Sequence, residues 1–121
     1  MEYSQEEINL AFDYFTVKAQ EIVNNYMESN FPTLPRQAIN VSEGSVYWKL
    51  MRSDDETDNK TTITYGLGST VYAFVRKKDG AIFRAASYKS PQTKGKQAIR
   101  AYVTDEWAAG VLTPHGVCYA R

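Results

Sequence analysis

The spacing of apolar residues in the first thirty positions predicts one long amphipathic helix. Ser4 and Glu7 form a capping-box pattern, which marks a helix start because their side chains bond amides of the first turn. Apolar residues then recur at spacings of three and four, at Ile8, Phe12, Phe15, Ala19, Ile22 and Tyr26. Asn30 and Phe31-Pro32 end the pattern, since proline disfavours helical backbone at the residue before it. We expect a helix that starts at about Gln5, carries this stripe over some 22 residues and ends at Asn30 with Phe31-Pro32.

A change of period after residue 36 predicts a hairpin of two strands. Ile39 and Val41 alternate with polar neighbours, and after a turn at residues 42–44 the apolar positions are Val46, Trp48 and Leu50. Alternation of this kind is typical of strands with one buried face. Residues 53–60 are polar throughout and predict an exposed turn, and residues 61–65 predict a third strand.

Residues 71–103 predict a second hairpin followed by a second helix. A strand at residues 71–75 leads into Lys78-Asp79-Gly80, whose Asp-Gly pair favours a tight turn, and the returning strand runs from Ile82 toward Tyr88. Ser90-Pro91 predicts the start of a helix that continues to about Val103. Its buried edge is predicted to comprise Ala98, Ile99 and Tyr102. Residues 117–119 predict a short edge strand.

These elements together predict a single α+β domain over residues 1–121. A long N-terminal helix packs on a four- to five-stranded antiparallel sheet, and a second helix lies near the C-terminus. The apolar stripe of the first helix must then be buried against the sheet, because an amphipathic helix needs an apolar partner.

Composition favours a protein of the cytoplasm. The chain of 121 residues has 43% hydrophobic residues and a single cysteine, which cannot form an internal disulfide. No apolar run reaches the length of a membrane helix, and the acidic start at Glu2, Glu6 and Glu7 is unlike a signal peptide. We therefore expect a cytoplasmic protein.

The sequence contains no convincing motif for catalysis or metal binding. His115 and Cys118 are three residues apart, but no third member of a nucleophilic site is identified by spacing, and Cys118 is better explained as a small buried strand residue. The acidic run Asp54, Asp55, Glu56 and Asp58 fails as a calcium loop, because Asn59 and Tyr65 occupy the places of the required Gly and Glu. We expect no enzymatic activity, no cofactor and no metal.

The distribution of charge points to a partner. The formal net charge is zero, but residues 1–60 hold five Lys or Arg against eleven Asp or Glu, and residues 61–121 hold nine against three. Cations at a hairpin tip and along the second helix would neutralise phosphates, while Tyr88 or Phe83 stacks on a base. The predicted nucleic-acid-binding residues are Arg76, Lys77, Lys78, Arg84, Tyr88, Lys89, Lys94, Lys96 and Arg100. Alternatively, these cations are solvated or pair with carboxylates of the first helix.

Three segments carry a resemblance to a known group of proteins. They are VYAFVRKKDGAIFRAASYKSP (residues 71–91), PHGVCYAR (residues 114–121) and RQAINVSEGSVYWKLMR (residues 36–52). The chain resembles a group of small bacteriophage and prophage proteins of unknown function, with Arg84, Tyr88 and His115 where the pattern of that group has Lys, Trp and Tyr. The resemblance implies a phage origin and a small accessory role in the host cell, and it implies no activity.

Two functional hypotheses follow, with a third kept beside them. The leading one is a non-enzymatic phage accessory protein that binds DNA or RNA through the basic residues. The rival is a phage-encoded inhibitor of a host defence or regulatory protein, an anti-CRISPR-like counter-defence role. It would use the aromatic sheet or the acidic face of the first helix at Glu6, Asp13 and Glu21. The third is a self-assembling homo-oligomer. None of the three requires a membrane.

Overall fold

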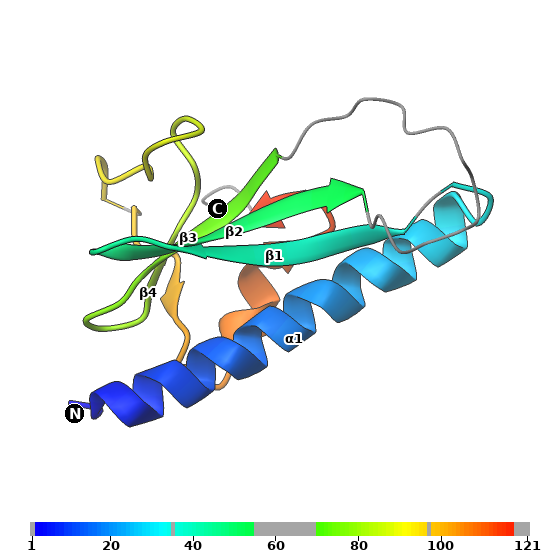
Figure 1. Ribbon diagram of the computed structural model, residues 1–121. Helices are drawn as coiled ribbons and strands as arrows, with labels where there is room; N and C mark the ends of the chain where they lie inside the picture. Colours follow the sequence, from blue (N-terminus) through cyan, green and yellow to red (C-terminus); the bar gives the residue numbers. More distant parts are fainter. Residues whose placement is uncertain (1, 35, 55–69, 97, 118–121) are drawn as a thin grey trace.

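A single long helix, α1 (Gln5–Asn30), lies along one face of the sheet (Figure 1). The computed structural model describes residues 2–34, 36–54, 70–96 and 98–117. The predicted capping box is present: Ser4 Oγ accepts from the Glu7 amide at 3.2 Å, and a Glu7 carboxylate oxygen accepts from the Ser4 amide at 3.0 Å. The helix is 26 residues long and ends where Phe31 donates its amide to the Met27 carbonyl. The predicted end of the helix at Asn30 and Phe31 is therefore confirmed, and the helix extends one turn beyond the last residue of the apolar stripe.

The buried face of α1 follows the predicted stripe for its first half. Its buried residues are Ile8, Phe12, Phe15, Ala19, Val23 and Met27. Two steps of four residues follow Ala19, so the buried row turns slightly around the helix. Ile22 and Tyr26, which we predicted as the end of the stripe, are partly buried at its margin.

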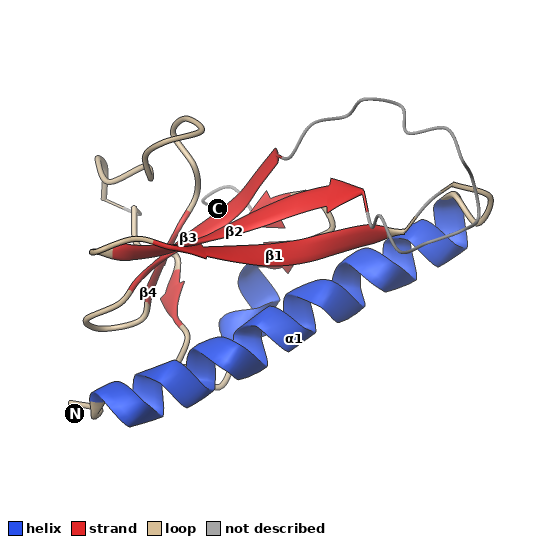
Figure 2. Cartoon of the chain, viewed as in Figure 1, coloured by secondary structure: helices blue, strands red, loops and turns tan. Residues whose placement is uncertain are grey.

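Five strands form one antiparallel sheet in the order of the sequence (Figure 2). They are β1 (Gln37–Glu43), β2 (Tyr47–Asp54), β3 (Thr70–Arg76), β4 (Ala81–Phe83) and β5 (Ala101–Tyr102). Both predicted hairpins are confirmed, and Gly80 supplies a positive φ of 78° where the second hairpin turns. Adjacent strands joined by short turns explain this order, because each hairpin pairs with its own neighbour.

The main core lies between α1 and one face of the sheet. Phe12 stacks on Trp48 with ring centroids 4.0 Å apart, and Leu50, Val75 and Ile82 are fully buried there. A short helical turn, η1 (Ala108–Val111), and a small two-stranded sheet, β6 (Leu112–Thr113) with β7 (Gly116–Val117), complete this core. The α+β class, with one long helix on a five-stranded antiparallel sheet, is confirmed.

The helix predicted to start at Ser90-Pro91 and to reach Val103 is wrong. The described part of this span contains bends, an isolated bridge from Ala85 to Pro91, and then β5. The Arg100 amide donates to the Ile82 carbonyl and the Val103 amide to the Gly80 carbonyl, each at 2.9 Å. Pairing with β4 therefore uses the amides that a helix would need. The helical turn found near the C-terminus is η1.

Residues 84–96 and 98–100 are here called the basic segment, and its residues 84–96 lie on the face of the sheet opposite α1 (Figure 1, yellow). Ala98 of this segment is buried against Phe74 and Phe83, and Ala85 packs at the edge of the same cluster. The strand predicted to continue to Tyr88 ends at Phe83, because the Gln92 amide donates back to the Arg84 carbonyl at 2.8 Å. The chain thus leaves the sheet and folds over its second face.

Some predicted features lie outside the described residues. These are most of the polar turn at residues 53–60, the third strand at residues 61–65, and the end of the strand at residues 117–119. Val117 itself belongs to β7. Within the part of the chain that the structure describes, no helix combines the length and apolar character needed to cross a bilayer.

Candidate nucleic-acid interface

Arg76 at the end of β3 is held by the turn that follows it. Its guanidinium makes two bonds to the Asp79 carboxylate, at 2.7 and 3.1 Å, and the same carboxylate accepts from the Ala81 amide at 3.1 Å. Partial burial raises the pKa of Asp79, but the bonds from Arg76 and Ala81 outweigh it and leave that pKa lowered. The guanidinium also lies 5.3 Å from the Phe83 ring centroid. Arg76 therefore stabilises the hairpin, and its charge is compensated.

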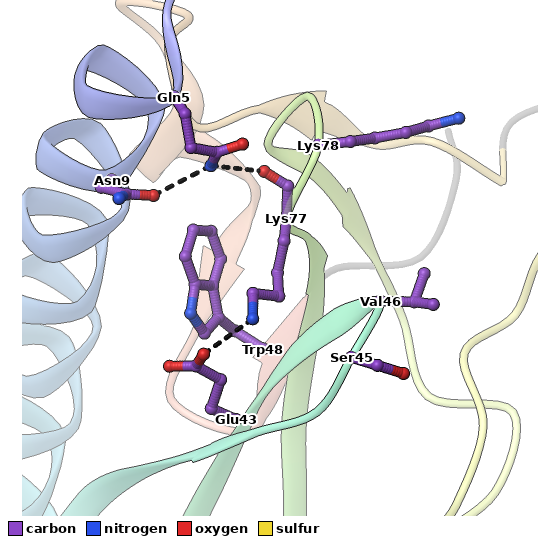
Figure 3. Close-up of a pocket in the computed structure, with 8 residues that line it drawn as sticks. All are labelled: Gln5, Asn9, Glu43, Ser45, Val46, Trp48, Lys77 and Lys78. Atoms are coloured by element: carbon purple, nitrogen blue, oxygen red, sulfur yellow. Dashed lines mark hydrogen bonds and ion pairs between the residues drawn. The ribbon is translucent and has the colours of Figure 1, made fainter.

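Lys77 joins both hairpin turns to the start of α1 (Figure 3). Its ammonium contacts a Glu43 carboxylate oxygen at 2.7 Å and the Gly44 carbonyl at 3.1 Å, and its carbonyl accepts from Gln5 Nε2 at 2.8 Å. The bond from Lys77 lowers the pKa of Glu43. Gln5, Glu43 and Lys77 are among the residues that line a cavity of about 580 Å³ over Trp48. The cation at its wall is already paired within the protein.

Lys78 differs from its two neighbours. Its side chain is exposed and points away from α1 in Figure 3. It forms no ion pair with any carboxylate of the described residues. The hairpin tip thus contributes one available cation where the sequence predicted three.

The basic segment contains five cations and no carboxylate, as no Asp or Glu occurs between Asp79 and Asp105. Lys89, Lys94 and Lys96 are exposed, and within the described residues none of them has a carboxylate partner. Among the described residues, no carboxylate therefore compensates the positive charge of these three side chains. They are the part of the predicted site that is open to a ligand.

The two arginines of the basic segment are more constrained. Arg84 donates from Nε to the Val117 carbonyl at 3.2 Å, which ties the segment to β7. Arg100 is partly buried, and its Nε and Nη1 atoms are shielded from solvent without a hydrogen-bond partner in the described structure. Neither guanidinium is presented as a whole to solvent.

Tyr88 is the exposed aromatic residue of the segment, and Lys49 lies beneath it. The Lys49 ammonium is 3.6 Å from the centroid of the Tyr88 ring, which is 58% exposed. Lys49 comes from β2, on the strand face opposite Trp48 and Leu50. Phe83, the other residue proposed to stack on a base, is only 2% exposed and cannot do so.

Lys49 was missed by sequence reasoning. The alternation of β2 does place it on the sheet face away from Trp48, which was the available signal. The sequence pattern does not show that residues 84–96 fold over that face, because it predicts a strand toward Tyr88 and a helix from Ser90-Pro91 there.

The carboxylates of α1 do not cancel the basic segment. In the described structure, Glu21 pairs with Lys18 at 3.3 Å and Glu28 with Arg36 at 3.6 Å, and no α1 carboxylate pairs with a cation of residues 84–100. Of the predicted binding residues, Arg76 forms an ion pair with Asp79 and Lys77 with Glu43, and neither carboxylate belongs to α1.

The outward face of α1 carries an apolar patch. Leu10, Tyr14 and Val17 are 71%, 64% and 55% exposed, and their spacing of four and three places them on one side of the helix. That side is opposite the buried residues. Its acidic neighbours on the helix are Glu6, Glu7, Asp13 and Glu21.

His115 has a packing role. Its ring meets Tyr26 edge to face at 5.1 Å, and its Nδ1 lies 3.4 Å from Arg52 Nη1, which donates to the Pro114 carbonyl at 2.8 Å. Cys118 lies outside the described residues. Within those residues, no three His, Cys, Asp or Glu side chains gather as metal ligands would.

The molecule is thus a small α+β domain in which one helix covers a five-stranded antiparallel meander and a basic segment covers its other face. Residues 5–111 match a family of unknown function, DUF7717, and the chain belongs to that family. The match includes both hairpins and the whole basic segment. No curated protein and no solved structure matches the chain.

Proposed function

We propose that this is a non-enzymatic phage accessory protein that binds nucleic acid in the cytoplasm of the host cell. The observation that carries the proposal is the exposed, acid-free basic segment, in which Lys89, Lys94 and Lys96 have no carboxylate partner in the described structure. Lys78 and Lys49 add positive charge from the hairpin tip and the sheet. Exposed lysines of this kind neutralise the phosphates of a nucleic-acid backbone.

The energetic argument is electrostatic. Each lysine that meets a phosphate releases condensed counterions, so binding weakens steeply as salt is added. A protein of zero net charge gains no general attraction to a polyanion, and the affinity must therefore come from this local segment.

The proposal is tested by fluorescence anisotropy with a labelled oligonucleotide of about 20 nucleotides, titrated between about 50 and 200 mM salt. We expect binding at low salt that weakens as salt rises, and an affinity at least about tenfold lower for the K89A/K94A/K96A variant. K18A, which removes a partly exposed lysine of α1 that pairs with Glu21, is the control outside the basic segment and should bind as the wild type does. Absent or salt-independent binding would overturn the proposal.

A second candidate function is the inhibition of a host protein through the outward face of α1. Exposed apolar residues at helical spacing are typical of a protein-binding surface. The acidic residues beside Leu10, Tyr14 and Val17 select a partner with a cationic rim around an apolar site. A second copy of α1 fits poorly, since the helix carries five carboxylates against one lysine and two copies would repel.

This second candidate is tested with a synthetic helical peptide of leucine and lysine, compared with a leucine–glutamate peptide of the same pattern. We expect the lysine peptide to bind, and L10S/V17S to weaken it at least about tenfold, since apolar anchors dominate such contacts. V41S replaces an exposed valine on β1, away from this face, and is the control. Equal binding by both variants would contradict a role for this face.

A further inference from the structure

The ring of Tyr88 is held in place from one side. The Lys49 ammonium lies against the ring at 3.6 Å from its centroid, at the distance of a cation–π contact. The Ser87 hydroxyl accepts hydrogen bonds from the amides of Lys89 and Ser90 at 3.3 and 3.2 Å. These two bonds hold the backbone in a turn around Tyr88. Tyr88 nevertheless remains 58% exposed.

An exposed aromatic ring beside cations that have no carboxylate partner among the described residues has a specific use. A nucleobase can stack on the free side of such a ring only where it is not already stacked in a duplex. The cations in the same segment, Lys89, Lys94 and Lys96, would follow the phosphates of the same strand. A duplex would use these cations and leave the ring without a partner.

We infer that the basic segment binds single-stranded nucleic acid, with one base stacked on Tyr88 against the support of Lys49. The inference rests on the proposed function, because it names the class of nucleic acid that this site takes. Lys49 is a positioning residue here, since it acts through the tyrosine ring. It also adds a charge that compensates a nearby phosphate.

The experiment compares a thymidine oligonucleotide with a mixed-sequence duplex that has the same number of phosphates, at one low salt concentration. We expect the single strand to bind at least about fivefold more tightly, the size of one stacking contact. Y88A should lose this preference, and Y88F should keep it, because phenylalanine retains the ring. Tyr88 is exposed, so both variants are expected to fold, which circular dichroism checks.

An abasic strand separates stacking from charge. It should bind the wild type no better than the duplex does, and Y88A should not change its affinity. Equal affinity for single strand and duplex would overturn the inference while leaving nucleic-acid binding in place. A preference for the single strand that survives in Y88A would also overturn it. No binding of any of the three probes would overturn the proposed function itself.

Discussion

Two groups of cations that are neighbours in the sequence have different environments in the fold. At the tip of the β3–β4 hairpin, Arg76 and Lys77 meet Asp79 and Glu43 at 2.7 Å each. In the basic segment, Lys89, Lys94 and Lys96 are exposed and have no such partner in the described structure. The comparison shows that a count of charges along a chain overstates the charge that a ligand meets, because turns and strand ends consume part of it.

The largest expected effect on stability comes from replacing a glycine in the hairpin turn, compared with a glycine in the basic segment. Gly80 in the hairpin turn has φ 78°, and a Cβ there would lie 2.7 Å from Val103 Cγ2. Gly95 in the basic segment has φ 105° with open space around it. We expect G80A to lower the free energy of unfolding by about 2–3 kcal/mol and G95A by about 1 kcal/mol, since both strain the backbone but only the first also clashes. Chemical denaturation measures both; equal losses would show that the hairpin is no more tightly packed than the segment.

The next effect concerns the hairpin charge pair. D79N removes the carboxylate that holds Arg76, and we expect it to lower the free energy of unfolding by about 1.5 kcal/mol at neutral pH. The folded pKa of Asp79 is lowered, so its contribution is present above the ordinary value of 3.8 and is lost as pH falls through the folded pKa. Denaturation of both proteins at neutral and acid pH should therefore show the difference shrinking in acid. A difference that grows in acid would contradict the assigned pair.

A smaller effect of opposite sign is expected at Arg100. Two of its guanidinium nitrogens are shielded from solvent without a partner in the described structure. Replacing a charge that is buried without compensation by an apolar side chain of similar length removes a desolvation penalty, so R100M should raise the free energy of unfolding by about 1 kcal/mol. K96M, at an exposed position of the same segment, is the control and should have little effect. Destabilisation by R100M would mean that the guanidinium is satisfied.

The smallest effects on stability are expected at the exposed lysines. K89A, K94A and K96A should each change the free energy of unfolding by less than about 0.5 kcal/mol, because their ammonium groups have no ion-pair or hydrogen-bond partner in the described fold. Thermal denaturation in the absence of ligand checks this. If one of them is strongly destabilising, that lysine belongs with the hairpin cations and is not a free ligand-binding group.

The sequence predicted the fold best where local signals and tertiary packing agree. The capping box at Ser4, the apolar stripe from Ile8 and the Asp79-Gly80 turn each led to the element that the structure contains. The helix predicted after Ser90-Pro91 failed because amides of this stretch, such as those of Arg100 and Val103, find partners on and beside β4. Backbone pairing between residues this far apart in the chain cannot be recognised from the local sequence pattern.

Only part of the candidate site could be predicted from the sequence, again because long-range contacts decide the rest. Lys89, Lys94, Lys96 and Tyr88 are exposed on the basic segment as a ligand-binding role requires. Arg76 and Lys77 are paired with carboxylates, and the Glu43 that meets Lys77 lies 34 residues away in the chain. Lys49 approaches Tyr88 only because the segment folds over the second face of the sheet. Contacts across the sheet therefore decide which cations remain available.

The most direct test of the central claim is a nuclear magnetic resonance titration of isotope-labelled protein with a thymidine oligonucleotide. The account predicts that amide shifts concentrate in the basic segment and near Lys49, while the amides of Arg76 and Lys77 and those of α1 change little. Shifts confined to α1 or to the hairpin tip, or no shifts at low salt, would contradict it.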